Sequence, residues 1–195
     1  MIMRLRSRGI SDPDVTRAIE IIPRSRFVTE DQRARAYEDV ALPIPCGQVS
    51  FTPLLTAQFL QLARLSPETK TLIIGAGSGY MAGLATCLSR RVYLVERFGE
   101  VLAYAEANLL RAEAAGITAR WGDGRYGWKA NAPFDRILIT ASLSKPPTAL
   151  LSQLAPGGHL VGVIDGNLAT HDGETIMPVL AANIPALIPG KSERL

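Results

Sequence analysis

The pattern of apolar and polar positions changes character near residue 69. Before that point, apolar residues recur at the spacing of a helix face. The first such set is Val15, Ile19 and Ile22. Ser11 and Pro13 are typical of a helix start, and Pro23 ends the pattern, so we expect a helix between them. A second short helix is expected to begin at Thr29.

The segment 37–48 is rich in turn-forming residues and favours an extended loop. Thr52 and Pro53 then combine a helix N-cap with a proline at the first helical position. The helix that follows is expected to bury one apolar stripe. That stripe is marked by Leu55, Phe59 and Leu62.

From residue 69 onward, short apolar runs alternate with helical patterns. The apolar runs predict strands over 71–74, 92–96, 117–121, 136–141 and 159–164. Helices are expected over 79–89, over 100–115 with Gly116 as the C′ residue, and briefly after Pro147. One or two more strands are expected within 174–189. This alternation predicts an α/β fold with a doubly wound, mainly parallel sheet and helices on both faces.

Composition indicates how the chain is organised. Its 195 residues, 47% hydrophobic and 20% charged, suit one domain. We expect residues 1–68 to form an amino-terminal helical and substrate-loop region, and residues 69–195 a ligand-binding sheet core. No apolar run approaches the roughly 18 residues of a membrane span, and the start lacks the apolar segment of a secretory signal. A cytoplasmic protein without membrane partners is therefore expected.

The net charge is +3, and much of the excess is arginine near the amino end. These arginines are Arg4, Arg6, Arg8, Arg17, Arg24, Arg26, Arg33 and Arg35. Acidic residues are interleaved with them, which indicates a solvated helical face rather than a nucleic-acid patch. Cys46 and Cys87 are expected to be small core residues. With His159 and His171 they give no metal-ligand spacing, so no metal is expected.

A glycine-rich turn joins the first strand of the predicted sheet to its helix. It consists of Gly75, Ala76, Gly77, Ser78, Gly79 and Tyr80. Ligands of such sheets bind beyond the carboxyl ends of the strands, and glycines allow close approach. A dinucleotide fingerprint needs a third glycine where Tyr80 stands; this spacing is instead typical of S-adenosylmethionine-dependent methyltransferases. The alternative is a plain β-to-α connection.

Two carboxylates follow the next two strands. Glu96 closes the second strand, where it can accept both hydrogen bonds of a ribose diol; the alternative is a surface glutamate paired with Arg97. Asp123, between Gly122 and Gly124, follows the third strand and can accept from an adenine amine. The alternative for Asp123 is a turn aspartate. Together with the glycine turn, these sites favour an adenosine-type ligand.

Seven segments, in order along the chain, match one family. They are PRSRFV (23–28), AYEDVALPI (36–44), IGAGSGY (74–80), VYLVER (92–97), GDGRYG (122–127), PFDRILITA (133–141) and LAPGGHLVGVI (154–164). Through them the chain resembles the protein-L-isoaspartate O-methyltransferases. The resemblance implies a class I methyltransferase (Rossmann-like) fold and S-adenosyl-L-methionine as cofactor. It also implies methyl esterification of isoaspartyl residues, a repair reaction on damaged proteins, by a monomeric enzyme.

The same resemblance implies which residues contact the cofactor. They are the glycine turn 75–80, Glu96, Arg97, Gly122, Asp123, Gly124 and Thr140. The partners it implies are isoaspartyl-containing proteins or peptides, and no nucleic acid is expected.

The segment 47–53 departs from the family pattern. The family's serine, which the resemblance implies acts in catalysis, is replaced by Phe51, with hydroxyls on either side at Ser50 and Thr52. These three are the candidate catalytic residues. Either Ser50 takes over a positioning hydrogen bond, or Phe51 plugs the site and impairs activity. An aspartyl carboxylate is already ionised at neutral pH, so the reaction needs alignment rather than a general base.

Two other classes of function stay open. One is a methyltransferase with a different acceptor, such as a small carboxylate or RNA. The residues after the 136–141 strand are Ala141-Ser142-Leu143-Ser144 rather than N-P-P-[FY], which disfavours an amino-methylating nucleic-acid enzyme. The other is a degenerate donor-binding protein without isoaspartyl activity.

Overall fold

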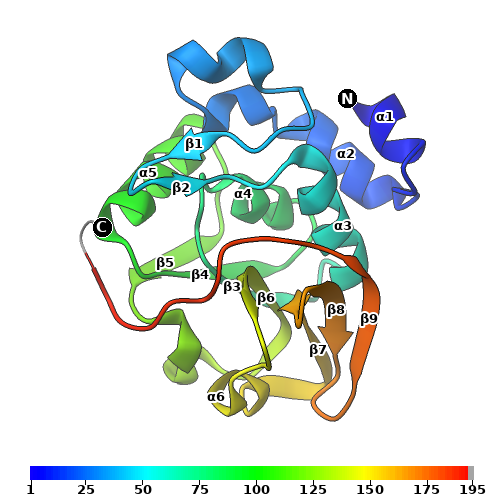
Figure 1. Ribbon diagram of the computed structural model, residues 1–195, viewed down its shortest axis with the longest axis vertical. Helices are drawn as coiled ribbons and strands as arrows, with labels where there is room; N and C mark the ends of the chain where they lie inside the picture. Colours follow the sequence, from blue (N-terminus) through cyan, green and yellow to red (C-terminus); the bar gives the residue numbers. More distant parts are fainter. Residues whose placement is uncertain (193–195) are drawn as a thin grey trace.

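A seven-stranded sheet forms the centre of the computed structural model, which describes residues 1–192. Its strand order is β5-β4-β3-β6-β7-β8-β9 (Figure 1). The parallel strands are β3 (Lys70–Ile74), β4 (Arg91–Glu96), β5 (Ile117–Trp121), β6 (Phe134–Leu143) and β7 (Leu154–Ile164). Two antiparallel strands follow, β8 (Asn167–His171) and β9 (Ile176–Ala181). The predicted mainly parallel, doubly wound sheet is confirmed, and its order reverses between β3 and β6.

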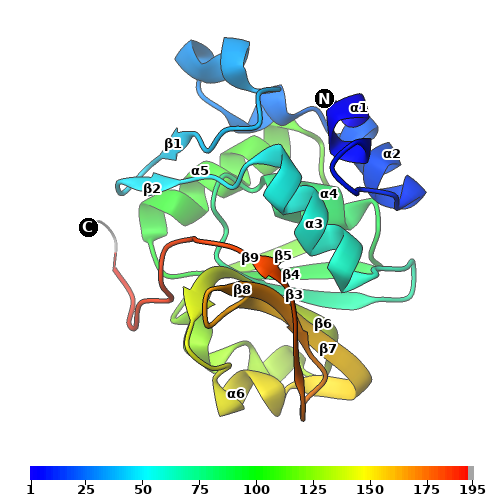
Figure 2. The ribbon, with the colours of Figure 1, turned by 45° about the vertical axis from the view of Figure 1, so that its right-hand side comes forward.

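Helices cover both faces of this sheet (Figure 2). One face carries α2 (Pro13–Ile21), α3 (Pro53–Ala63), α4 (Tyr80–Thr86) and α5 (Gly99–Arg111), and α1 (Ile2–Arg6) packs on α3. The other carries α6 (Thr148–Leu151) and the short 3-10 helices η3 (Gly124–Tyr126) and η4 (Lys129–Asn131). Side chains alternate between the two cores along β3, where Ile73 joins the first and Leu72 and Ile74 join the second.

An irregular segment connects α2 to α3. It contains two 3-10 helices, η1 (Arg24–Phe27) and η2 (Glu30–Arg35), and a two-stranded ribbon of β1 (Pro43–Ile44) and β2 (Gln48–Val49). The helix expected at Thr29 is therefore 3-10, and the predicted loop 37–48 includes this ribbon. The ribbon lies above the carboxyl ends of the central strands (Figure 1).

The helix starts are set by capping side chains. Asp12, not Ser11, caps α2, because its carboxylate accepts from the backbone N–H groups of Asp14 and Val15 at 2.9 and 3.2 Å. Thr52 caps α3 as predicted, accepting from Leu55 N at 3.2 Å. The stripe predicted for α3 is confirmed in part: Phe59 is buried, whereas Leu55 and Leu62 are half-buried and pack at the edge of the core. The buried face runs through Thr56, Phe59, Leu60 and Ala63. This helix is apolar nearly all round, so spacing alone did not select its buried face.

Both helices of the sheet core end earlier than predicted. At the end of α4, Cys87 N and Leu88 N bond three residues back, which tightens the last turn before β4. At the end of α5, Glu113 takes the left-handed conformation that closes the helix, with φ of 57°; Gly116 also has a positive φ, of 84°, but lies three residues further on. Ala114 N then bonds back to Leu109 O at 3.0 Å, and Gly116 instead opens β5.

Several other expectations were incomplete or wrong. The strands β6 and β7 extend beyond 136–141 and 159–164, β8 was not predicted, and β9 lies within the expected 174–189. Cys87 is exposed and Cys46 half-buried, so neither is a core residue: Cys87 is the C-cap of α4, and Cys46 lies in the turn between β1 and β2. Arg24 does not belong to a solvated face: it is 1% exposed. Within residues 1–192, no helix has the length and apolarity to cross a membrane.

Candidate functional site

A cavity opens over the carboxyl ends of β3, β4 and β6, beside the point where the strand order reverses. It encloses about 1000 Å³, its open mouth included. Three parts of the chain form its walls. The glycine wall comprises Ile74–Ser78, Tyr80, Met81, Val95–Phe98, Val101, Gly124, Thr140 and Ala141. The loop wall comprises Ile44, Gln48–Phe51 and Thr56, and the tail wall is Pro185–Ile188.

The glycine turn is shaped by its contact with β6. Gly75 has φ of +94°, and a Cβ there would lie 2.1 Å from Thr140 Oγ1. That hydroxyl donates to Ile74 O at 2.9 Å, so it holds the end of β3 at the strand-order reversal. Gly77 also has positive φ, but a Cβ there would meet no atom within 4 Å. Gly75 is thus required by packing, whereas Gly77 leaves its backbone open to a ligand.

Glu96 is buried in the glycine wall, with 6% of its surface exposed. Its Oε2 accepts from Ala76 N at 2.8 Å and its Oε1 from Phe98 N at 2.9 Å. It makes no ion pair with Arg97, whose guanidinium lies over the Phe98 ring, so the alternative of a surface glutamate is wrong. A carboxylate has about four acceptor sites, so acceptor capacity is left for a ligand.

Asp123 lies beside the cavity, outside its walls. Its carboxylate forms an ion pair with Arg125 at 2.8 Å, accepts from Gly190 N at 2.8 Å, and caps η3 through Arg125 N. Burial works to raise the pKa of the Asp123 carboxyl, but these hydrogen bonds outweigh it and hold the pKa below its usual value. An adenine amine at this carboxylate has to share it with those donors.

The remaining predicted cofactor residues divide between the cavity and its support. Ala76, Ser78, Tyr80, Arg97, Gly124 and Thr140 line the cavity, as do Gly75, Gly77 and Glu96. Gly79 lies outside the walls at the start of α4, where a Cβ would meet Ala105 O of α5 at 3.0 Å. Gly122 also lies outside, and its N–H bonds Glu96 O at 2.8 Å. Burial raises the pKa of the Tyr80 hydroxyl, which keeps it neutral.

The three candidate catalytic residues have different positions. Ser50 and Phe51 line the cavity, and the Phe51 ring packs against Phe59 of α3 with centroids 5.2 Å apart. Thr52 does not reach the cavity, because its hydroxyl caps α3. Phe51 therefore forms part of the wall, and Ser50 is the hydroxyl-bearing candidate that lines the cavity.

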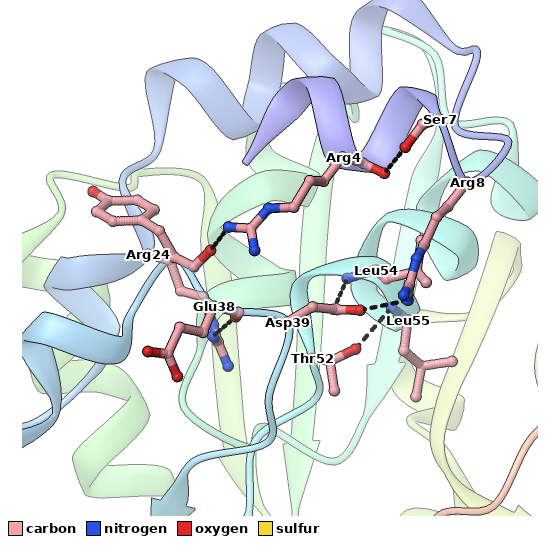
Figure 3. A network of polar contacts seen from close by, with 10 residues as sticks. Arg4, Ser7, Arg8, Arg24, Glu38, Asp39, Thr52, Leu54 and Leu55 are labelled. Carbon is pink, nitrogen blue, oxygen red and sulfur yellow. Dashed lines mark hydrogen bonds and ion pairs between the residues drawn. The ribbon is translucent and has the colours of Figure 1, made fainter.

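The loop wall is held by polar side chains that sequence reasoning missed (Figure 3). The buried guanidinium of Arg24 donates to backbone carbonyls of the irregular segment, among them Val40 O at 3.0 Å and Phe51 O at 2.9 Å. Asp39 accepts from Leu54 N at the start of α3 and pairs with Arg8 at 3.1 Å. Burial lowers the pKa of the Arg24 guanidinium. Nothing in the local pattern around Arg24 distinguishes it from its exposed neighbours.

The tail wall was also missed. Its residues belong to the apolar stretch from which further strands were predicted, and they run beside the end of β6. There Ser142 N donates to Pro185 O and Leu187 N donates to Ser142 O, both at 2.8 Å. The tail wall thereby joins the cavity although it lies more than forty positions after Ser142 in the sequence. Within residues 1–192, no three His, Cys, Asp or Glu side chains gather as a metal site would require.

Comparison with known proteins places these features in a family. The sequence pattern of the family described as Protein-L-isoaspartate(D-aspartate) O-methyltransferase (PCMT) matches residues 1–171. The chain belongs to this family. It is 41% identical to the protein-L-isoaspartate O-methyltransferase of Paramagnetospirillum magneticum, over 99% of this chain and 95% of that protein. It is 45% identical to the protein of the same name from Rhodospirillum centenum, over 83% of this chain and 73% of that protein.

Solved structures support the same fold. A protein-L-isoaspartate O-methyltransferase of Plasmodium falciparum, solved with S-adenosyl-L-homocysteine, superposes with a TM-score of 0.81 at 22% identity and covers 96% of both chains. A second solved structure, also named protein-L-isoaspartate O-methyltransferase, superposes with a TM-score of 0.79 at 24% identity. The match covers 95% of this chain and 64% of that chain. The family match includes the glycine and loop walls, and the tail wall lies beyond it.

Proposed function

We propose that this chain transfers the methyl group of S-adenosyl-L-methionine to the free carboxylate of isoaspartyl residues in damaged proteins and peptides. One observation carries the proposal: in a chain of this family, a single cavity joins the glycine turn and Glu96 to the loop wall. Relatives with 41% and 45% identity bear the name of this enzyme. A structural neighbour was solved with the demethylated donor.

The residues of the glycine wall fit such a donor. The open backbone at Gly77 allows a ligand to approach, and the buried Glu96 carboxylate can accept from a ribose diol. Apolar side chains of Val95, Phe98 and Val101 offer a surface for a flat ring. Gly75, Ala76, Ser78, Tyr80, Arg97, Gly124 and Thr140 complete this proposed donor site, with Gly79, Gly122 and Asp123 supporting it from outside the wall.

The donor supplies an activated methyl group, and the chain supplies alignment. The acceptor carboxylate, with an ordinary pKa of about 3.9, is ionised at neutral pH and needs no base. The loop wall has to hold this carboxylate in line with the methyl group, and its apolar side chains Ile44, Val49 and Phe51 exclude water. Phe51 contributes bulk rather than a hydrogen bond, which leaves Ser50 as the proposed positioning hydroxyl.

The finer partner and location assignments rest on family membership. We propose a cytoplasmic monomer that acts on isoaspartyl proteins or peptides and requires no nucleic acid. The core shared by the amino-terminal helices and the sheet supports a single domain over residues 1–195, composed of the regions 1–68 and 69–195.

A turnover assay with paired peptides tests this function. Labelled S-adenosyl-L-methionine is incubated with two peptides of one sequence, containing either isoaspartate or aspartate. We expect label in the isoaspartyl peptide only. Mild base should release this label, because it hydrolyses methyl esters. The Glu96→Ala variant should weaken donor binding roughly 10- to 100-fold by calorimetry, because two charge-assisted hydrogen bonds are lost.

The negative results of that assay have separate meanings. Donor binding at micromolar levels without label in either peptide would indicate another acceptor or a degenerate protein. Absence of donor binding at millimolar concentration would refute the proposed donor site itself.

A further inference from the structure

Arg24 is a buried cation without a carboxylate partner. It is 1% exposed, and among residues 1–192 no acidic side chain lies within ion-pair distance of it. Five oxygen atoms surround its guanidinium instead. They are Ala36 O at 3.1 Å, Glu38 O at 3.4 Å, Val40 O at 3.0 Å, Phe51 O at 2.9 Å and Ser50 Oγ at 3.2 Å. A single side chain thus fixes the irregular segment and the loop wall together.

The contact with Ser50 determines what that hydroxyl can do. A serine hydroxyl has two acceptor lone pairs and one proton to donate. Ser50 Oγ accepts from Arg24 Nη2 and from Leu42 N, both at 3.2 Å. Both lone pairs are therefore used, and the proton remains. In the described part of the chain no oxygen accepts that proton, while Ser50 lines the cavity.

We propose that Arg24 is a positioning residue, which holds Ser50 so that its hydroxyl donates a hydrogen bond into the cavity, to the carboxylate that receives the methyl group. This inference rests on the proposed function. Because Arg24 and Leu42 N occupy the lone pairs, the hydroxyl acts as a donor and not as an acceptor. The buried positive charge behind Oγ strengthens that donor, since charge-assisted and linked hydrogen bonds reinforce one another. Ser50 thereby supplies the hydroxyl that Phe51 lacks.

A purely structural role for Arg24 makes a different forecast. If Ser50 and Arg24 only hold the segment together, Ser50→Ala leaves Leu42 N without its acceptor, so thermal stability falls and KM for the peptide rises while kcat is unchanged. If Ser50 is the donor, Ser50→Ala lowers kcat itself and leaves the donor site intact. The mild Ser50→Ala change therefore decides the question even if variants of Arg24 fold poorly.

The experiment compares Ser50→Ala, Arg24→Lys and their combination with the wild-type chain. Each is measured for thermal unfolding, for binding of S-adenosyl-L-homocysteine, and for kcat and KM on the isoaspartyl peptide. We expect kcat to fall about tenfold in Ser50→Ala, with ligand affinity within about twofold of wild type. Arg24→Lys keeps the positive charge but loses the planar guanidinium that donates to several oxygens at once. Adding Ser50→Ala to Arg24→Lys should lower kcat/KM no further than Arg24→Lys alone. The matched control is Arg26→Lys, at an exposed arginine of the same η1 helix, which should leave all values unchanged.

Each contrary outcome has one meaning. An unchanged kcat in Ser50→Ala, with an active wild type, overturns this inference and leaves the proposed function standing. So does a double variant whose losses multiply, because Ser50 and Arg24 then act independently. A wild-type chain that does not methylate the peptide overturns the proposed function, and the role given to Ser50 with it.

Discussion

The glycine wall and the loop wall face one cavity but are held in different ways. The glycine wall stands on the ends of hydrogen-bonded parallel strands, and its turn is fixed by regular structure and by Thr140 of the neighbouring strand. Before α3, the only regular structure in the loop wall is a ribbon of two strands with two residues each. The buried Arg24 and the helix-capping Asp39 hold this wall in place. The first is thus specified by backbone geometry, and the second by a few long-range side-chain bonds.

This contrast has a consequence for how each wall responds to substitution. Substitutions in the glycine wall should also destabilise the sheet, because the residues of this wall belong to the ends of its strands. Damage to the loop wall can remain local, because the segment 36–51 contributes few strand hydrogen bonds. Stability and donor binding should therefore report on the first wall, and peptide kinetics on the second.

The largest effect is expected at Gly75. In Gly75→Ala, the alanine has to adopt a backbone φ of +94°, and its Cβ would collide with Thr140 Oγ1. We therefore expect the free energy of unfolding to fall by about 3 kcal/mol and donor binding to be lost. Urea unfolding and calorimetry measure both. Gly77→Ala is the matched control, since its Cβ has open space; it should cost about 1–2 kcal/mol through φ alone.

The Gly75 prediction can be sharpened by removing the opposing hydroxyl. In a Thr140→Ala background the collision disappears and only the φ strain remains, so Gly75→Ala should cost less there than in the wild type. Equal costs in the two backgrounds would show that the contact with β6 does not shape the turn.

A smaller and more local effect is expected at Asp39. Asp39→Ala removes the acceptor of Leu54 N at the start of α3 and the ion-pair partner of Arg8. We therefore expect the free energy of unfolding to fall by about 1 kcal/mol. The KM for the isoaspartyl peptide should rise while affinity for S-adenosyl-L-homocysteine stays constant. Glu38→Ala, which removes an exposed pair with Arg35, is the control and should change neither. A parallel loss of donor affinity would show that the two walls are not separable.

The smallest effect concerns the contact between α3 and β7. His159 Nε2 lies 3.1 Å from Leu62 O, and burial, followed by the charge of Arg136, lowers its pKa below the usual 6.5. As pH falls through about 6.5, the unfolded chain binds a proton at this residue before the folded chain does, so folding stability decreases. Urea unfolding at neutral and mildly acidic pH should show this decrease in the wild type, and a smaller one in His159→Gln. Equal slopes would mean that His159 is protonated alike in both states.

Local sequence determined the parallel sheet and the glycine wall. The apolar runs predicted β3 and β4 in place because strands buried on both faces need continuous apolar residues, a property readable within five or six positions. β5 also lies where it was predicted, although none of its residues is buried. The spacing of the glycines relative to β3, and of Glu96 at the end of β4, follows from the same local alternation. In a parallel sheet, the ends of neighbouring strands necessarily meet at one edge.

Only the tertiary structure decided which polar residues hold the loop and tail. Arg24 resembles its exposed neighbours in sequence, and its burial depends on Phe51, which lies 27 positions away. The partner of Asp123 at Gly190 is separated by 67 positions, so a residue predicted to face the ligand is held beside the cavity instead. A buried polar group must find a partner wherever the folded chain supplies one, and periodicity carries no information on contacts at that range. Local sequence thus indicated the glycine wall of the cavity, whereas folding decided how the loop and tail walls are held.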